Sequence, residues 1–415
     1  MIDCMVNMRI VHINNTDLPG SRFNGHDMQI ALNKMGFISH QFVYEKEGNN
    51  PNTIQIAPTS EERVLWHQYY KMEKKLSLNA LFFPFARNIM IDDTFKTADI
   101  VHCHLIQNYF FSLYDLLKMS HMKPLVWTIH DPWALTGHCV HPIDCVNWKS
   151  GCVLCPHLDR YFPIEADNSS LMWDIKYSIY STLKIDIVVA SHWMENLIRE
   201  SPLTKHFENV HMIPFGVNTE VFTCAYNQEK IRSQMGIPND SFVIFFRAES
   251  STYKGFDIIL KTLSALKIKK HVTIITVGSA KLPLELLIKY KTIELGWVSN
   301  NNILAELYCA CNVFLMPSIA EAFGMMAIEA MASGRPIIVM DGTSLPDVTF
   351  VPDCGISISR ANAVHELKEG IEHLMQYPDE CRKRGEIGRA LAMKHYSFDI
   401  YLEKHIQLYE SILSR

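Results

Sequence analysis

Residues 313–336, "VFLMPSIAEAFGMMAIEAMASGRP", combine a strand, a loop and a helix in the order that decides the fold. The apolar run at 313–317 predicts a buried strand, and Gly334 and Pro336 predict the end of the helix that follows. The loop between strand and helix brings backbone N–H groups and a helix N-terminus to one place, which is typical of an anion site. Two carboxylates flank it, Glu321 in the loop and Glu329 on the helix.

The same alternation of apolar strands and amphipathic helices extends along the whole chain. In the first half, strand-like runs lie at 8–14, 37–44, 98–104, 123–130 and 184–190. After Pro214 and Gly216 a second set lies at 240–248, 271–278, 292–298, 312–317 and 335–341. Continuous apolar strands separated by helices indicate parallel sheets covered on both faces. We therefore expect an α/β protein with two doubly wound, Rossmann-like domains.

The domain boundaries follow from this restart of the pattern. A chain of 415 residues suits two domains of roughly 200 residues each. We expect an N-terminal domain at 1–213, a linker at 214–227, a C-terminal domain at 228–395, and a helix at 396–415 that packs back on the first domain. Two such domains facing each other form a cleft at the carboxyl ends of both sheets, where open α/β folds bind ligands.

The charge and the distribution of apolar residues narrow the classes of function that the protein can have. The net charge of −5 gives no global basic field for nucleic acid. The N-terminus has no signal-peptide pattern, and no apolar run reaches the roughly 18 to 20 residues of a membrane-spanning helix. We therefore expect a cytoplasmic protein, at most peripheral on the membrane, whose first seven residues form a dispensable leader before Met8.

A pair of cations indicates which ligand the loop and helix with Glu321 and Glu329 would bind. In "FRAESSTYKGFD" (246–257), Arg247 closes a predicted strand and Lys254 precedes a predicted helix. Two cations at the end of one sheet would neutralise a diphosphate and stabilise its charge as a leaving group. Each feature alone has an ordinary interpretation, namely solvated cations and two surface glutamates. Together they match a nucleotide-sugar, with diphosphate on the cations and helix end, ribose on Glu329 and sugar on Glu321.

The C-terminal half resembles the retaining family 4 glycosyltransferases of the GT-B fold. The resemblance rests on 246–257, on "LGWV" (295–298), on the joint "MIPFGVNTEVF" (212–222) and on the E-x7-E spacing within 313–336. That spacing, followed by "EAMASGRP", is among the more specific signatures of the family. Matching segments at 9–17 and 127–139 extend the resemblance to essentially the whole chain. It implies two domains facing across a cleft.

The resemblance also implies roles for individual residues. Arg247 and Lys254 would contact the donor diphosphate, and Glu329 would hold the ribose hydroxyls. The backbone near this site would contribute through Gly20, Phe323, Gly324 and Met325, with Val298 near the base. Glu321 and His130 would be the catalytic residues that position the donor sugar and stabilise an oxocarbenium-like centre. One departure stands out, because Phe246 occupies the position before the arginine where the family usually has glycine.

The implied reaction is transfer of a hexose-type sugar with retention at the anomeric carbon, in which the departing phosphate helps to deprotonate the acceptor hydroxyl. The donor would be a UDP-sugar, with a GDP-sugar as the alternative. The acceptor would be a saccharide on polyprenyl diphosphate, in the synthesis of a bacterial O-antigen, capsule or exopolysaccharide. No cofactor or metal is expected in catalysis, because the chain has no D-x-D carboxylate clamp.

Four cysteines form a separate cluster in an insert at 138–157, "HCVHPIDCVNWKSGCVLCPH". The spacing C-x5-C-x6-C-x2-C suits a tetrahedral structural zinc ion, while reduced thiols and two disulfides are the competing interpretations. The candidate ligands are Cys139, Cys145, Cys152 and Cys155.

A candidate membrane-facing segment lies at 67–87, "HQYYKMEKKLSLNALFFPFAR", which mixes aromatic residues, lysines and apolar residues. It could meet a lipid-linked acceptor at the interface. An amphipathic helix whose apolar face belongs to the core explains the same pattern.

Two other functions fit the fold expectation. A nucleotide-sugar epimerase shares the two-domain architecture but gives no reason for the E-x7-E helix. A non-catalytic partner subunit would retain the fold, although such a protein would be expected to have lost at least one of Arg247, Lys254, Glu321 and Glu329.

Overall fold

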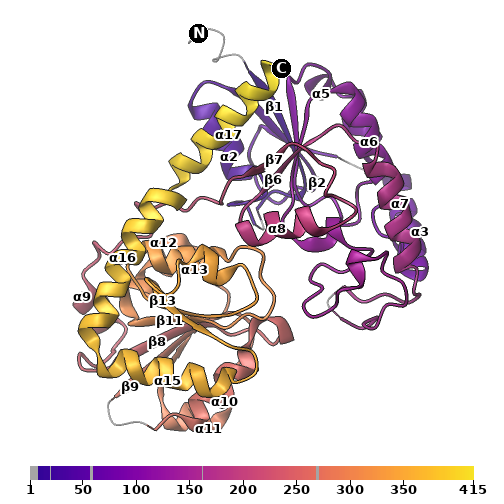
Figure 1. Ribbon diagram of the computed structural model, residues 1–415. Coiled ribbons are helices and arrows are strands. Elements are labelled where there is room, and N and C mark those ends of the chain that lie inside the picture. Colours follow the sequence, from indigo (N-terminus) through magenta and orange to yellow (C-terminus); the bar gives the residue numbers. More distant parts are fainter. Residues whose placement is uncertain (1–7, 19, 57–58, 161, 268–270) are drawn as a thin grey trace. The chain divides into compact units, whose positions relative to one another are not determined.

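The computed structural model describes residues 8–18, 20–56, 59–160, 162–267 and 271–415. The predicted leader at 1–7 lies outside the described residues. The chain forms two compact units, one of Met1–Ile213 with Tyr401–Arg415, and one of Pro214–Ile400 (Figure 1). Each unit is built around its own parallel sheet, and we describe each by itself.

The first unit contains a seven-stranded sheet in the order β3-β2-β1-β4-β5-β6-β7. All of its pairings are parallel. The strands are β1 (Arg9–Thr16), β2 (Ile38–Glu45), β3 (Thr53–Gln55), β4 (Ile100–Cys103), β5 (Leu125–Thr128), β6 (Asp186–Val189) and β7 (Val210–Met212). The helical segments are α2 (His26–Lys34), α3 (Ser60–Leu76), α4 (Ala86–Ile91), α5 (Asp93–Lys96), α6 (Leu113–Met122), η1 (Pro132–Leu135), η2 (Asn147–Lys149), α7 (Ser169–Tyr180) and α8 (His192–Glu200).

The second unit contains a six-stranded parallel sheet in the order β10-β9-β8-β11-β12-β13. Its strands are β8 (Phe242–Arg247), β9 (Val272–Val277), β10 (Lys291–Glu294), β11 (Val313–Met316), β12 (Ile337–Met340) and β13 (Gly355–Ile358). The helical segments are α9 (Gln228–Gln234), η3 (Thr252–Lys254), α10 (Phe256–Ala265), α11 (Leu284–Lys289), α12 (Asn301–Ala310), α13 (Met325–Ala332), α14 (Leu345–Val348), α15 (Ala363–Gln376) and α16 (Pro378–Tyr396). The predicted fold class, two doubly wound α/β sheets, is confirmed.

Alternate residues of β8 fill the two faces of the second sheet. Phe246 packs into the cluster formed with α10 and α15, where its ring lies 6.3 Å from that of Phe256. Phe245 points to the opposite face and meets Tyr308 of α12 at 5.0 Å. Because successive side chains of a strand point to opposite faces, a strand covered on both sides must be apolar throughout. Phe246, which replaces the family's glycine, is therefore a core residue.

The last helix, α17 (Phe398–Leu413), contributes its residues from Tyr401 onward to the first unit. Tyr409 is fully buried, and its hydroxyl lies 2.7 Å from Nδ1 of His102 in β4 and donates to the sulfur of Met28 in α2. Residues at the end of the sequence thus complete the core around the N-terminal strands.

The second half of the segment at 67–87, after α3, is core. Leu78, Leu81, Phe83 and Phe85 are all buried, so the apolar residues that could have met a lipid surface pack inside the first unit. The interpretation as an apolar membrane-facing surface is wrong for these residues, because the chain turns inward directly after α3. Among the described residues, no helix combines the length and apolar character needed to cross a bilayer.

Glu73 holds this inward turn. Its carboxylate is buried and accepts backbone N–H bonds from Ala80 (3.1 Å), Leu81 (2.9 Å) and Phe82 (3.0 Å). Burial raises its pKa from 4.5 to about 7, although these three bonds oppose the rise. The residue therefore closes a loop that has no regular secondary structure.

We expect Glu73→Gln to destabilise the protein by about 1–3 kcal/mol, because the amide NH2 would face the N–H of Ala80. Since the folded pKa lies above the unfolded value, the contribution of Glu73 is complete below about pH 4.5 and declines toward pH 7. Urea unfolding at several pH values should show the gap between wild type and variant narrowing across that window. Glu61→Gln, at an exposed position of the same helix, is the control. A gap that widens with pH would contradict the assignment.

Candidate functional site

The candidate residues gather where the strand order of each sheet reverses. In the second unit β8 lies between β9 and β11, so successive crossovers leave in opposite directions from β8 and β11. In the first unit the same reversal falls between β1 and β4. Open α/β sheets bind ligands at the carboxyl ends of the strands at such a switch point. Arg247 ends β8 and the Glu321 loop follows β11, so both lie at the switch point of their sheet.

Arg247 lies on the rim of the second sheet. Its guanidinium makes a 2.7 Å ion pair with Glu249 and lies 5.3 Å from the centre of the Trp297 ring. Its side chain is 36% exposed, but Nε is buried and Nη2 is paired with Glu249, which leaves Nη1 as the group open to an anion. Glu249 and Trp297 were not identified from the sequence. Trp297, at 74% exposure, is one of the most exposed large apolar residues and flanks Val298, the residue predicted to lie near the base.

Lys254 and Glu321 form an ion pair. The Lys254 ammonium lies 2.8 Å from a carboxylate oxygen of Glu321, and both side chains are mostly buried. Burial is the largest single influence on Lys254 and would lower its pKa, but the charge and the hydrogen bond of Glu321 together raise that pKa above its ordinary value. The lysine therefore stays charged at neutral pH. The backbone carbonyl of Glu321 accepts from both the N–H and the hydroxyl of Ser344, which fixes the loop.

The helix α13 begins at this loop, and its N-cap residue is a glycine, which has no side chain to cap the helix. Its N-cap, Gly324, has φ +97°, and a Cβ there would lie 2.4 Å from Leu345. Phe323 is buried edge-on against Phe215, with ring centres 5.1 Å apart, and Met325 is the first helical residue. Backbone N–H groups at such a helix end carry partial positive charge. The arrangement suits a phosphate group.

Glu329 lies deeper than expected. It is fully buried in the second turn of α13, and the hydroxyl of Tyr308 donates to its carboxylate at 3.1 Å. The interpretation of Glu321 and Glu329 as two surface glutamates on an amphipathic helix is therefore wrong. Tyr308 lies on α12 and was not identified from the sequence. The apolar sequence of α13 was the available signal, since a helix that is apolar all round is buried.

The first unit brings Gly20 and His130 to one place. Gly20, at φ +76°, lies in the turn after β1, and a Cβ there would lie 2.6 Å from the Phe23 ring. That ring in turn lies 5.6 Å from the ring of His130, which follows β5. Nε2 of His130 is 3.4 Å from Nδ1 of His104, and burial lowers the pKa of His130 to about 3. His130 is therefore neutral at physiological pH.

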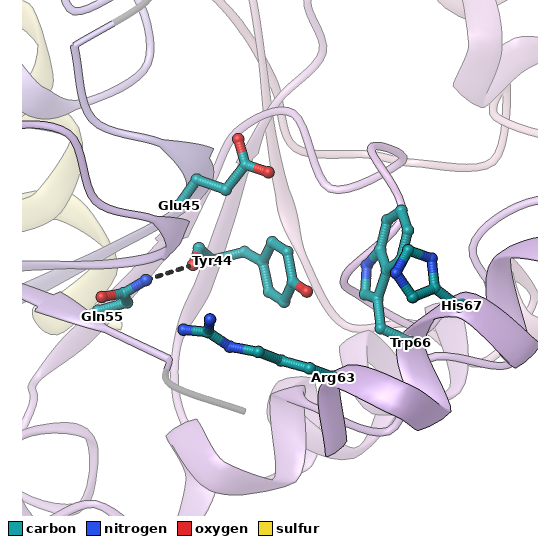
Figure 2. A pocket seen from close by; sticks show the side chains of 6 residues that line it. All are labelled: Tyr44, Glu45, Gln55, Arg63, Trp66 and His67. Atoms are coloured by element: carbon teal, nitrogen blue, oxygen red, sulfur yellow. Dashed lines mark hydrogen bonds between the residues drawn. The ribbon is translucent and has the colours of Figure 1, made fainter. Parts of the chain in front are cut away.

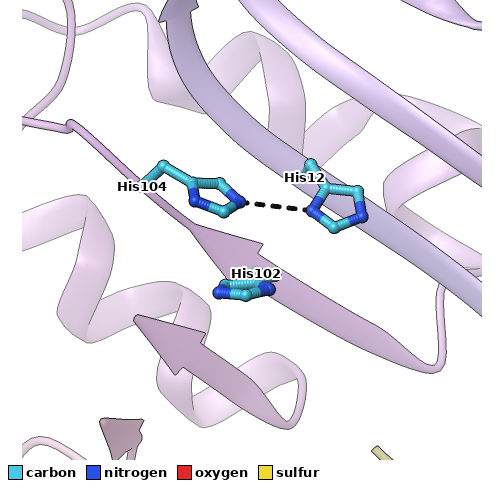
Figure 3. A group of neighbouring side chains, drawn as sticks. All are labelled: His12, His102 and His104. Atoms are coloured by element: carbon cyan, nitrogen blue, oxygen red, sulfur yellow. Dashed lines mark hydrogen bonds between the residues drawn. The ribbon is translucent and has the colours of Figure 1, made fainter. Parts of the chain in front are cut away.

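The cysteine insert has little regular structure but a defined shape. Cys139, Cys145, Cys152 and Cys155 line one small cavity and form no disulfide. Burial, together with the neighbouring thiols, raises the pKa of Cys139 to about 12. Three metal-ligand side chains do come together elsewhere among the described residues. The ligand atoms of His12, His102 and His104 all lie within 4.8 Å of one another (Figure 3), whereas no three of the four cysteine sulfurs do.

Two family models match the chain on either side of the joint. The model "Glycosyltransferase Family 4" matches residues 31–221, and the model "Glycosyl transferases group 1" matches residues 227–391. Between them the two models take in most of the chain, one for each unit.

Relatives of known or assigned name are distant. An uncharacterized glycosyltransferase of Methanocaldococcus jannaschii is 23% identical over 78% of this chain and 74% of its own length. The MMP α-(1→4)-mannosyltransferase of Mycolicibacterium hassiacum is 28% identical over 50% of each chain. The putative colanic acid biosynthesis glycosyl transferase WcaC of Escherichia coli is 36% identical, over 22% of this chain and 26% of its own.

Solved structures share the fold over nearly the whole chain. Sucrose-phosphate synthase of Thermosynechococcus elongatus superposes with a TM-score of 0.70 at 16% identity, covering 98% of this chain and 99% of that one. HepE of Anabaena, solved in complex with UDP and glucose, has a TM-score of 0.68 at 15% identity, covering 97% of this chain and 100% of that one. The two doubly wound units have the GT-B fold. With both family models matched, this chain is a glycosyltransferase of the family 4 type.

Proposed function

We propose that the protein is a retaining, metal-independent hexosyltransferase that moves a sugar from a UDP-sugar to a saccharide hydroxyl, with a GDP-sugar as the alternative donor. The observation that carries this is the charged Lys254 beside Glu321, next to the N-terminus of α13 and on the same sheet rim as Arg247. Cations and helix N–H groups fixed around a departing diphosphate stabilise the transition state. Glu321 would position the donor sugar and Glu329, held by Tyr308, the ribose hydroxyls.

The test is a panel of nucleotide-sugars incubated with purified protein and saccharide acceptors. We expect nucleoside diphosphate to be released from one matching donor, with EDTA leaving the rate unchanged and NMR showing a retained anomeric configuration. Release of an epimerised sugar without acceptor would instead identify an epimerase. Failure to bind any nucleotide-sugar would identify a non-catalytic subunit.

A hollow in the first unit is our candidate for the acceptor. It has a volume of about 370 Å³ and lies where β2 ends, beside α3 (Figure 2). The ring of Trp66 stacks on those of Tyr44 (6.3 Å, 17°) and Tyr70 (5.1 Å, 10°). Aromatic faces with nearby hydrogen-bonding groups suit a sugar ring. The polar groups lining the hollow are Glu45, Gln55, Arg63 and His67.

We further propose that this saccharide is carried on polyprenyl diphosphate at the cytoplasmic face of the membrane, in the synthesis of a bacterial surface polysaccharide. The proposal is supported by relatives named for colanic acid biosynthesis and for a cps region. Arg63, whose guanidinium faces the hollow, would bind the anionic part of such an acceptor (Figure 2).

We expect Arg63→Ala to raise the acceptor KM about tenfold, the contribution of one charge-assisted hydrogen bond, with donor KM unchanged. Initial rates at varied acceptor and donor concentrations give both values. Lys71→Ala, at an exposed position of the same helix, should change neither constant. Equal effects of the two substitutions would place the acceptor elsewhere.

The cysteine cluster is proposed to hold one structural zinc ion, with no part in catalysis. The thiols of these four described cysteines line one cavity and form no disulfide, which leaves them available to a metal. No three of their sulfur atoms lie within 4.8 Å of one another, so binding would draw them together. The ion would fix a loop that otherwise contains only the short helix η2.

Elemental analysis is expected to find about one zinc per chain, as one four-thiolate site requires. The double variant Cys152→Ser, Cys155→Ser should lose the metal, whereas Cys224→Ser, at an exposed cysteine of the other unit, should keep it. The zinc site would be refuted if these four cysteines reacted as free thiols in protein that holds no metal. It would also be refuted by a measured mass lower than that of the reduced chain by two disulfide bonds.

A further inference from the structure

Three histidines, His12, His104 and His130, are linked by hydrogen bonds in the core of the first unit, and we call them the histidine file. His12 lies in β1, His104 directly follows β4, and both are essentially buried. Nδ1 of His12 lies 3.3 Å from Nε2 of His104 (Figure 3). Nδ1 of His104 lies 3.4 Å from Nε2 of His130. His104 therefore uses one ring nitrogen toward each neighbour.

The protons along this file have only two arrangements. Burial lowers the pKa of His12 to about 3 and that of His104 well below its ordinary value, so the rings are neutral. A neutral imidazole carries one N–H and one lone pair. His104 must therefore donate to one neighbour and accept from the other. Fixing the proton on His12 fixes the tautomer of His130.

Nε2 of His12, the ring nitrogen that faces away from His104, decides between these two proton arrangements. This nitrogen is buried, and no described residue offers it a hydrogen-bond partner. One arrangement would leave an unpaired N–H at this position and the other an unpaired lone pair. Among backbone groups, orphaned buried N–H donors are rarer than under-satisfied carbonyl acceptors, and we apply the same preference to this imidazole. We take the second arrangement, in which His12 donates to His104 and His104 donates to Nε2 of His130.

We infer that His104 is a positioning residue that fixes His130 in the tautomer with its proton on Nδ1. The part of this inference that concerns the sugar rests on the proposed function. There, His130 would meet a hydroxyl oxygen of the donor sugar as a hydrogen-bond donor and not as a general base.

The backbone is built closely around this file. Gly25, the N-cap of α2 at φ +89°, covers the His12–His104 contact, because a Cβ there would lie 2.6 Å from Nε2 of His104 and 2.9 Å from Nδ1 of His12. The indole N–H of Trp127 donates to the His104 carbonyl at 3.1 Å. The partial positive charge of the α2 N-terminus also disfavours an imidazolium here.

The hydrogen bonds of the neighbouring His102 argue against a metal ion bound by His12, His102 and His104. His102, His12 and His104 bring ligand atoms within 4.8 Å of one another. However, Nδ1 of His102 lies 2.7 Å from the Tyr409 hydroxyl, and its Nε2 lies 2.7 Å from the hydroxyl of Thr128. Both nitrogens of this third ring are already engaged, so a metal would have to break one of these bonds.

The first test is the tautomer itself. Nitrogen-15 NMR of the full chain, with histidines assigned by single substitutions, should show protons on Nδ1 of His12, His104 and His130. Protons on Nε2 of His12 and His130 would overturn the inference. So would a stoichiometric metal lost on His12→Gln. This measurement needs no substrate, so it stands even if no nucleotide-sugar is turned over and the proposed function fails.

The second test compares His104→Asn with His104→Gln. The asparagine amide reaches the position of Nδ1 and can still donate to His130, whereas the glutamine amide reaches the position of Nε2 and contacts His12 instead. We expect the glutamine variant to lose about tenfold more in kcat than the asparagine variant, the effect of one hydrogen bond. Melting temperatures identify loss of folding. Equal losses in kcat by two folded variants would overturn the positioning role.

Discussion

Replacing Lys254 by alanine is expected to lower turnover about 10²–10³-fold, the loss seen when one preorganised charge-stabilising group is removed. The ammonium lies 2.8 Å from Glu321, and this carboxylate raises its pKa, so the group that is lost is a permanent cation. Stability should fall by about 1–3 kcal/mol, because the variant leaves the mostly buried carboxylate of Glu321 without its cation.

The measurement is kcat per folded molecule, with the folded fraction taken from thermal melts. Lys261→Ala removes an exposed cation of the neighbouring helix α10 and should change neither quantity. If the melting temperature of Lys254→Ala collapsed while kcat per folded molecule held, Lys254 would be a structural residue and not a donor ligand.

The fold was predictable because its signals are local. Strands covered on both faces are apolar throughout, and α13 starts after Gly324 and ends before Gly334, as the breakers indicate. The strand, loop and helix around Glu321 follow from 24 consecutive residues. Each of these features depends only on neighbours along the chain.

Contacts between side chains on different strands of a sheet were not predictable in the same way. Lys254 and Glu321 lie 67 residues apart, and their pairing depends on β8 and β11 being neighbours. The histidine file requires the register that places His12 opposite His102. A sequence shows which side chains can bond, whereas strand order decides which of them meet.

The buried part of the segment at 67–87 could not be assigned from its sequence for a related reason. Its aromatic and apolar residues fit either a membrane interface or a core, and composition does not distinguish the two. The buried carboxylate of Glu73 decides by turning the chain inward. In the sequence Glu73 stands beside Lys74 and Lys75 like an ordinary solvated charge, and only the three backbone N–H groups that donate to it reveal its role.

A glycine pair offers the second large effect, this time on stability. Gly255 follows Lys254 and precedes α10 at φ +70°, and a Cβ there would lie 2.2 Å from the carbonyl oxygen of Pro317. Gly296 has the same φ of +70°, but nothing lies within 4 Å of its Cβ position. The two sites share backbone strain and differ in steric clash.

We expect Gly296→Ala to cost about 1–2 kcal/mol, the strain of a left-handed alanine alone. Gly255→Ala should cost at least about 3–4 kcal/mol, because two backbones must separate. It should also reduce turnover in the folded fraction, since Pro317 leads into the loop that carries Glu321. Thermal melts and kcat of both variants test this. Equal destabilisation would mean that the β11 loop yields freely, and then neither Lys254 nor Glu321 would be held in place as a preorganised site requires.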